Sequence, residues 1–183
     1  MHHDYYDQTL SERRRKKYAV VIFLPEHLDN IILPVRERFD PLYNLVPSHI
    51  SLVFPFESDL FLDELAPLIK AETEKQKKLI VHMNSIGDFY PKYPIIYWDV
   101  MENPDLKNLY FRLYTALSLS VPYKQYQPHV TIAREISNHR LMLVKDDVAP
   151  YLPTERFETS SVDLISPLAG AQWVSVRTFN LNG

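Results

Sequence analysis

The sequence contains no cysteine, and this absence removes several kinds of chemistry at once. Disulfide bonds, thiolate catalysis and cysteine-based zinc sites are excluded. A cysteine-free chain with a formal net charge of −3 fits the cytoplasm best, and we expect cytoplasmic localisation. The small net charge also excludes a protein that holds nucleic acid over its whole surface. Any nucleic-acid partner must therefore be held locally, and we expect no DNA partner.

Long hydrophobic runs are also missing. The apolar run at residues 18–24 follows a basic stretch, as in a signal sequence, but Pro25 and Glu26 end it well short of a membrane span. No small-residue cleavage site follows it. We therefore expect no membrane partner and interpret this run as the first strand of the fold. Residues 1–17 are predicted to form a polar N-terminal extension, and residues 18–183 a single domain.

The chain does contain enough apolar residues for a folded core, since 46% of them are hydrophobic and 13% aromatic. Their spacing predicts strands at residues 18–25, 48–56, 78–90, 93–100, 128–135, 160–170 and 172–181. It predicts helices at residues 26–39, 59–76, 103–120 and 137–149. The expected helix N-caps are Asp59, Asn103 and a residue near Ser137. The last two strands are predicted to pair around Gly170 and Ala171.

The order strand–helix–strand–helix–strand therefore occurs twice, over halves at approximately residues 18–91 and 92–183. Such a repeat indicates an internal duplication of the architecture. The predicted fold class is α+β, with two lobes related by a pseudo-twofold axis. Each lobe is expected to be a mainly antiparallel sheet backed by helices, with a central cleft between the lobes.

Two matched motifs lie in the second strand of each half: VPSHISLVFPF at residues 46–56 and YQPHVTIARE at residues 126–135. Because alternate residues of a strand face the same way, His49 shares a face with Ser51, and His129 shares a face with Thr131. The opposite faces are apolar and are expected to pack on helices: Ile50, Leu52 and Phe54 in the first strand, Val130 and Ile132 in the second. A pseudo-twofold axis would bring the two polar faces together across the cleft.

These four side chains suit phosphodiester chemistry. Two imidazoles that titrate near neutrality can divide the work of general base and general acid. Two hydroxyls can donate hydrogen bonds to non-bridging phosphate oxygens. The pattern predicts a displacement at phosphorus that needs neither a metal ion nor another cofactor. One imidazole would activate water or a ribose hydroxyl, and the other would protonate the leaving oxygen.

The paired His-x-Ser/Thr motifs resemble those of the two-histidine phosphoesterase superfamily, which includes 2′-5′ RNA ligase-like proteins and cyclic phosphodiesterases. The stretch RERFDPLYNLVPSHISL particularly resembles the short bacterial phosphoesterase branch of that superfamily. The resemblance implies a catalytic pair, His49 and His129, and phosphate-binding hydroxyls on Ser51 and Thr131. It implies a nucleotide or an RNA end as substrate. Ser51 stands where the family usually has threonine, and it keeps the hydroxyl.

Other interpretations of the motifs remain open at this stage. Either histidine alone could be a core residue bonded to the backbone, and a shared metal site lacks a third ligand at a recognisable spacing. A serine hydrolase would need a Gly-x-Ser-x-Gly elbow, which the sequence lacks. The main rival to an enzyme is a non-catalytic module that binds phosphorylated nucleotides or RNA ends in the same cleft. The sequence indicates no oligomeric state.

Further residues could lie near the cleft. Aromatic side chains near strand ends could stack on a nucleobase, although packing is the better interpretation for each: Tyr43, Phe56, Tyr90, Tyr93, Tyr123 and Tyr126. Lys124 is a weaker candidate. Arg134 could approach a phosphate, but strict strand alternation assigns it to the Val130 and Ile132 face, so we expect a solvated strand end there.

Overall fold

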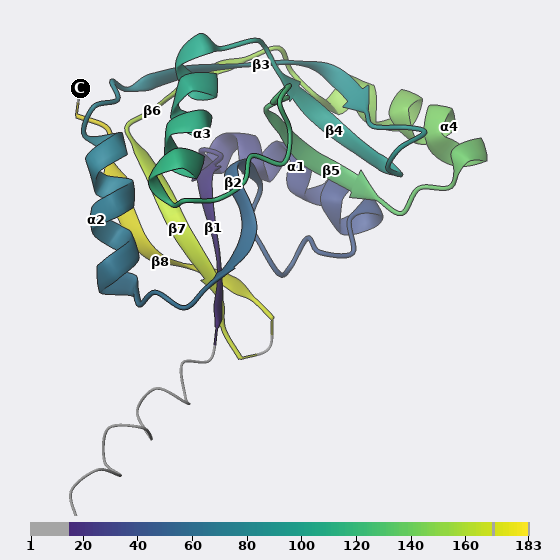
Figure 1. Ribbon diagram of the computed structural model, residues 1–183. Helices are drawn as coiled ribbons and strands as arrows, with labels where there is room; N and C mark the ends of the chain where they lie inside the picture. The colour runs from purple at the N-terminus through teal and green to yellow at the C-terminus, as the bar shows by residue number, and fades with distance from the viewer. Residues whose placement is uncertain (1–14, 170, 183) are drawn as a thin grey trace, which may run out of the picture.

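The computed structural model describes residues 15–169 and 171–182 (Figure 1). Along the chain, the helices are α1 (Glu26–Phe39), α2 (Leu62–Thr73), α3 (Pro104–Ala116) and α4 (Asn138–Val148), with a short 3-10 helix η1 (Ala149–Tyr151). The strands are β1 (Lys16–Phe23), β2 (His49–Ser58), β3 (Leu79–Asp88), β4 (Ile95–Val100), β5 (His129–Arg134), β6 (Arg156–Thr159), β7 (Ser161–Pro167) and β8 (Trp173–Asn180).

Within these residues the strands form one curled, eight-stranded sheet in the order β6-β3-β4-β5-β2-β1-β7-β8. Every neighbouring pair is antiparallel. The order is symmetric about the β5–β2 contact, because β4 flanks β5 as β1 flanks β2, and β3 flanks β4 as β7 flanks β1. The predicted α+β fold with two pseudo-twofold-related lobes is therefore confirmed, and the two motif strands lie at its centre.

The lobes do not consist of the two sequence halves alone, because the halves exchange elements. β3 follows α2 in the first half but pairs with β4, and β7 from the second half pairs with β1. The helices cross in the same way, since α1 packs on β5 and α3 packs on β2. Each half thus covers and extends the sheet of the other. This exchange makes the chain from β1 to β8 one packed unit around the central strands.

One continuous core holds the two lobes together. Ile50 and Val130, the residues that pair β2 with β5, are 0% and 1% exposed and point into it. Trp98 of β4 is fully buried and donates its indole N–H to the carbonyl of Asn84 at 3.2 Å. Tyr110 of α3, also fully buried, stacks on Tyr126 with ring centroids 4.0 Å apart. The core therefore fixes both motif strands from their apolar sides.

Of the three expected N-caps, two lie where the sequence predicts and one does not. Asn103 caps α3 as predicted, because its side-chain oxygen accepts the Leu106 amide at 3.0 Å. Asp59 is not the N-cap of α2, which begins later, after Phe61. The Glu64 carboxylate accepts the Phe61 amide at 2.7 Å, and Asp59 instead forms an ion pair with Arg15. Ser137 lies at the N-cap of α4 without a capping hydrogen bond from its side chain.

Two predicted features lie partly outside the described residues. Residues 1–14 of the expected N-terminal extension are among these, whereas Lys16 and Lys17 already belong to β1 and pair with β2. Gly170 is also outside them. Its neighbour Ala171 has a φ of 68°, and its amide bonds to the carbonyl of Leu168 where β7 turns into β8.

Candidate functional site

The two motif strands meet in register at a single pair, Ile50 and Val130. His49 and Ser51 flank Ile50 on β2, and His129 and Thr131 flank Val130 on β5. Each imidazole therefore shares a face with its own strand's hydroxyl two residues away.

All four side chains line one pocket with a volume of about 580 Å³. The four are half-buried, whereas the residues between them are buried on the opposite face. Aromatic and cationic side chains also line the pocket: Phe54, Phe89, Tyr93, Tyr123 and Trp173, with Lys17, Lys92 and Arg134. The pocket thus combines two imidazoles and two hydroxyls with apolar walls and positive charge.

The imidazoles are oriented by matched backbone hydrogen bonds. Nδ1 of His49 lies 2.8 Å from the carbonyl oxygen of Pro47, and Nδ1 of His129 lies 2.8 Å from that of Gln127. A carbonyl only accepts hydrogen bonds, so each Nδ1 carries the hydrogen. Nε2 of each ring is thereby left to take up or release a proton. This arrangement suits a pair of proton-transfer groups.

Burial lowers the pKa of both imidazoles, because a charged ring is poorly solvated in this pocket. The pKa of His49 is lowered to about 4, and the positive charges of Arg36 and Arg134 contribute to the shift. The pKa of His129 is also lowered, first by burial and then by Arg134. The bond to the Pro47 or Gln127 carbonyl opposes the shift in each case. Both shifts favour the neutral form of the free imidazole, and the pKa of His49 lies well below the near-neutral value expected from the sequence.

Aromatic rings pack tightly around His129. The ring centroid of Phe89 lies 4.9 Å from that of His129 in an edge-to-face arrangement, and the centroid of Tyr97 lies 5.1 Å away. Tyr97 has little freedom to move, because it also packs on Phe89 at 4.4 Å and crosses Gly87 of β3. A Cβ atom at Gly87 would lie only 2.5 Å from the Tyr97 ring. Glycine at this position thus permits the close approach that seats Tyr97 beside His129.

Arg134 lines the pocket, and the sequence-based assignment of this residue to the opposite face was wrong. The pairing of β5 with β4 shifts register between Thr131 and Ala133, so Ile132 is an extra residue on β5. Such a bulge reverses the alternation that follows it. Ile132 and Ala133 are both buried, and Arg134 returns to the face of Thr131.

Phe54 packs against the core as predicted, and it also lines the pocket. The pairing of β2 with β1 shifts register between Ser51 and Val53, so Leu52 is the extra residue. Leu52 and Val53 are both fully buried. The two motif strands therefore carry bulges at equivalent positions, and Phe54 in the first motif corresponds to Arg134 in the second.

A buried ion-pair network holds Arg134 and the segment before His49. The Asp40 carboxylate accepts hydrogen bonds from Arg36 at 3.0 and 3.1 Å and from Nε of Arg134 at 3.1 Å. Arg36 also donates to Oγ of Ser48 at 2.9 Å and to the carbonyl of Val46 at 3.0 Å. The side chains of Arg36 and Asp40 are 3% and 1% exposed. The network connects the end of α1 to both motif strands, and nothing in the paired motifs indicates it.

Some of the other residues predicted to lie near the cleft line the pocket, and others do not. Tyr93, Tyr123 and Tyr126 line the pocket, whereas Tyr43, Phe56, Tyr90 and Lys124 are not among its lining residues. Tyr126 is 7% exposed and donates its hydroxyl to the carbonyl of Ser51 at 2.7 Å. That bond fixes the backbone of the first motif. Tyr93 and Tyr123 are exposed and remain accessible to a ligand.

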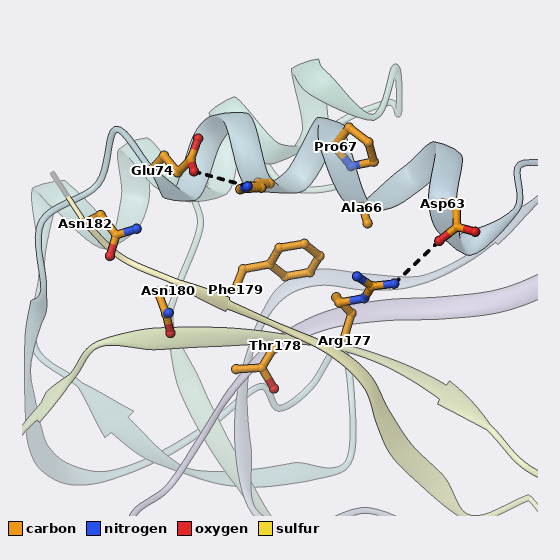
Figure 2. Close-up of a pocket in the computed structure, with 10 residues that line it drawn as sticks. Asp63, Ala66, Pro67, Glu74, Arg177, Thr178, Phe179, Asn180 and Asn182 are labelled. Carbon is orange, nitrogen blue, oxygen red and sulfur yellow. Dashed lines mark hydrogen bonds and ion pairs between the residues drawn. The ribbon is translucent and has the colours of Figure 1, made fainter.

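A second hollow of about 560 Å³ lies between α2 and β8 (Figure 2). Phe179 points toward α2 across it, and two ion pairs border it, Asp63 with Arg177 at 3.5 Å and Lys70 with Glu74 at 3.6 Å. None of the four motif residues lines it, and it contains no imidazole. Its charged groups are already paired with each other, so the pocket between the motif strands is the better candidate for chemistry.

Two features are absent from residues 15–169 and 171–182. No three side chains of histidine, aspartate or glutamate lie close enough together to bind a metal ion. No helix in this part of the chain combines the length and apolar character that crossing a membrane requires. The proposed independence from metal ions stays a prediction, because it depends on activity.

Comparison with known proteins identifies the family. The family model described as the 2′-5′ RNA ligase superfamily matches residues 24–171. A protein of Geobacillus kaustophilus named "Putative phosphoesterase GK0864" is 29% identical over 171 residues, which cover 91% of this chain and 97% of that protein. A "Putative phosphoesterase" of Bacillus pumilus is 29% identical over 170 residues, covering 90% and 97%.

Solved structures share the fold. The crystal structure of E. coli LigT complexed with 3′-AMP superposes with a TM-score of 0.65 at 16% identity, covering 93% of this chain and 100% of that one. A Thermus thermophilus protein, TT0787, gives a TM-score of 0.64 at 16% identity, covering 91% and 98%. The resemblance to two-histidine phosphoesterases that the paired motifs indicated is thereby confirmed, and this chain belongs to the 2′-5′ RNA ligase superfamily.

Proposed function

We propose that the protein is a metal-independent phosphoesterase that acts on a cyclic phosphate or a 2′-5′ phosphodiester of a nucleotide or an RNA end. One observation carries the proposal: two imidazoles, each with Nδ1 bonded to a carbonyl, line one pocket with two hydroxyls. Two imidazoles can transfer protons at both the attacking and the leaving oxygen of a displacement at phosphorus, and hydroxyls can bind the non-bridging oxygens. Family membership supports phosphoesterase chemistry in general. The pocket supports acid–base catalysis by two histidines.

The mechanism follows from the roles of the side chains. Nε2 of one histidine removes a proton from water or a ribose hydroxyl as the oxygen attacks phosphorus, and Nε2 of the other protonates the leaving oxygen. The hydroxyls of Ser51 and Thr131 donate hydrogen bonds to the non-bridging oxygens. Arg134 adds a positive charge on the same side of the pocket. These donors stabilise the charge that builds up on the phosphoryl oxygens in the transition state.

The pocket walls favour a nucleotide over a simple phosphate ester. A volume of about 580 Å³ falls within the range of roughly 300–1,000 Å³ that is typical of small-molecule sites. The exposed rings of Tyr93 and Tyr123 can stack on a base. Lys17 and Lys92 provide local positive charge, whereas the chain as a whole is slightly acidic. A nucleotide or a single RNA end fits this distribution better than a long RNA, and a cytoplasmic enzyme would meet such ends.

The test is a substrate screen with matched variants. Purified protein is assayed on nucleoside 2′,3′-cyclic phosphates, ADP-ribose cyclic phosphate and 2′-5′ linked oligonucleotides, with and without excess EDTA. His49→Ala and His129→Ala should each lower turnover by roughly 10²–10⁴-fold, the usual loss for a general acid or base. His27→Ala is the control, because this exposed histidine pairs with Glu155 outside the pocket. Activity should persist in EDTA.

The outcomes separate the alternatives. Near wild-type turnover by both pocket variants would refute the two-histidine mechanism. Loss of activity in EDTA with recovery on adding a divalent ion would show that the reaction requires a metal. If no substrate is cleaved but cyclic or terminal phosphates still bind competitively in the pocket, the protein is the non-catalytic binding module instead.

A further inference from the structure

The pocket extends beyond the two motif strands in both directions. Its lining residues run from Ile95 of β4 across β5, β2, β1 and β7 to Trp173 of β8. The imidazoles and hydroxyls on β5 and β2 therefore have pocket on either side of them. Beyond β5 lie Tyr93 and Tyr123, with Nζ of Lys92 5.2 Å and 5.7 Å from their ring centroids. The opposite side, on β1, β7 and β8, contributes only the charge of Lys17 to the function proposed above.

The pocket on β1, β7 and β8 is an apolar slot, defined by Ala19, Val46, Ile165 and Trp173. Ala19, Val46 and Ile165 are buried in a small hydrophobic cluster that is separate from the main core, and Trp173 packs against it. Ala19 and Ile165 pair directly across β1 and β7. Because alanine has the smallest side chain of the four, the slot has room at Ala19 for a flat ring beside the indole.

The segment that carries Val46 is held on both sides. The amide of Leu42 donates to Oδ1 of the buried Asp40 at 3.1 Å, and the carbonyl of Leu45 accepts the amide of Trp173 at 2.7 Å. Trp173 is thereby joined to this segment through its backbone, while its ring is only half-buried. The slot is thus formed in the free protein, which lowers the entropic cost of binding a ligand there.

The slot lies next to one of the hydroxyls proposed to bind phosphate. Val21 of β1 pairs with Ser51 of β2, and Ala19 lies two residues from Val21 on the same strand. Neighbouring strands are about 4.8 Å apart, and two residues of a strand span about 6.6 Å. A ribose bridges a comparable separation between its phosphate and its base. A phosphate bound at Ser51 can therefore place the base of an attached nucleoside in the slot.

Charge and polarity around the slot suit a nucleoside that is followed by a phosphate. The pocket is lined by three cationic side chains and, among the described residues, by no aspartate or glutamate. One of the cations is Lys17, two residues from Ala19 on β1. Glu57 lies opposite Lys17 on β2, but no ion pair joins these two described residues. The slot itself has only apolar side chains, so it fits any flat, uncharged base and selects none.

We propose that the apolar slot binds the second nucleoside of a substrate that has a nucleoside on each side of the scissile phosphate. The first base lies against Tyr93 and Tyr123, and the second lies against Trp173. Lys17 binds the next phosphate when the chain continues. The inference rests on the phosphoesterase function proposed above and selects within it. The preferred substrate is a 2′-5′ phosphodiester between two nucleosides, rather than the cyclic phosphate of a single nucleoside.

The kinetic test uses two substrates that differ only in the second nucleoside: 2′-5′ linked ApA and the methyl ester of adenosine 2′-phosphate. The wild type should prefer ApA by roughly 10–100-fold in kcat/KM, as expected for the stacking of one base. Trp173→Ala and Ala19→Leu should each remove most of this preference, whereas Trp173→Phe should keep it. Tyr93→Ala is the matched control, because it should weaken both substrates equally. Equal kcat/KM values for the wild type, or an unchanged preference in both Trp173→Ala and Ala19→Leu, would overturn the proposal.

A binding measurement separates the slot from the phosphoesterase function. The sequence has two tryptophans, and Trp98 is fully buried, so Trp173 is the one that a ligand in the pocket can contact. In the His129→Ala variant, which should cleave slowly, ApA should quench tryptophan fluorescence and the methyl ester should not. Adding Trp173→Phe should abolish the quench. Absence of a quench by ApA would refute the slot. A quench by ApA, with neither substrate cleaved by the wild type, would support the slot and refute the phosphoesterase function.

Discussion

Replacing Asp40 with asparagine should destabilise the protein far more than an equivalent change at the surface. The substitution keeps the size of the side chain and removes its charge. Arg36, which is 3% exposed and 3.0 Å from the carboxylate, then loses its counter-ion in the core. Removing one partner of a buried ion pair costs about 3–5 kcal/mol, because the other charge stays buried and uncompensated. We expect a loss in that range in the free energy of unfolding.

The matched control is Asp147→Asn, which breaks an ion pair of similar length on the surface. Arg38 and Asp147 are 2.9 Å apart but 68% and 45% exposed. Exposed pairs contribute at most about 1 kcal/mol. Both variants are compared with the wild type by urea unfolding at pH 7, with circular dichroism as the readout and a common slope to confirm two-state behaviour.

Two further results bear on this reasoning. Adding Arg36→Met to Asp40→Asn should recover part of the lost stability, because it removes the buried charge that the single change leaves unpaired. Asp40→Asn should also lower kcat/KM, since Arg134 loses the carboxylate that holds it at 3.1 Å. A cost within about 1 kcal/mol of that of Asp147→Asn would refute the view that this network is a buried, charge-dependent support of the pocket.

Other predictions concern the pocket itself. Because burial lowers the pKa of both imidazoles, to about 4 in one case, the plot of log kcat/KM against pH should be a bell. Its acid limb should lie near 4 and its basic limb below the ordinary histidine value of about 6.5; a maximum at or above pH 7 would contradict this. Thr131→Val and Ser51→Ala should each lower kcat/KM by roughly 10²-fold while both limbs stay in place, as expected for lost oxyanion donors. A displaced limb would instead show that the hydroxyls take part in proton transfer. Gly87→Ala should cost about 1–3 kcal/mol in thermal unfolding and lower turnover, because the new Cβ displaces Tyr97; unchanged stability would show that the ring relaxes freely.

The motif pairing was predictable because it depends on local periodicity. His49 with Ser51 and His129 with Thr131 need only the alternation of a strand to share a face, and the repeated element order indicated that the two faces would meet. Both conditions are visible in one sequence. The structure brings all four residues to one pocket, while their catalytic and phosphate-binding roles stay predictions that the variants above will test.

A strand bulge accounts for the error at Arg134, and the equivalent bulge in β2 explains why Phe54 lines the pocket as well as packing on the core. A bulge adds one residue to one strand of a pair, so it is defined by the partner strand and leaves no clear mark in the hydrophobic pattern. Strict alternation was therefore correct up to Thr131 and incorrect beyond it. The short strand β6 was missed for a related reason. It has four residues with only Phe157 buried, too few for a period to be seen.

The sequence by itself determined the α+β class, the duplicated order of elements and the two motif strands, because each depends on residue spacing within a segment. Tertiary structure alone decided which lobe of the sheet each half's third strand joins, since β3 pairs with β4 and β7 pairs with β1. It also decided that Asp40 connects Arg36 to Arg134, and that Asp99 of β4 lies opposite His129. These contacts join residues far apart in the chain, and the free energy of packing and charge burial selects them only once the whole core has formed.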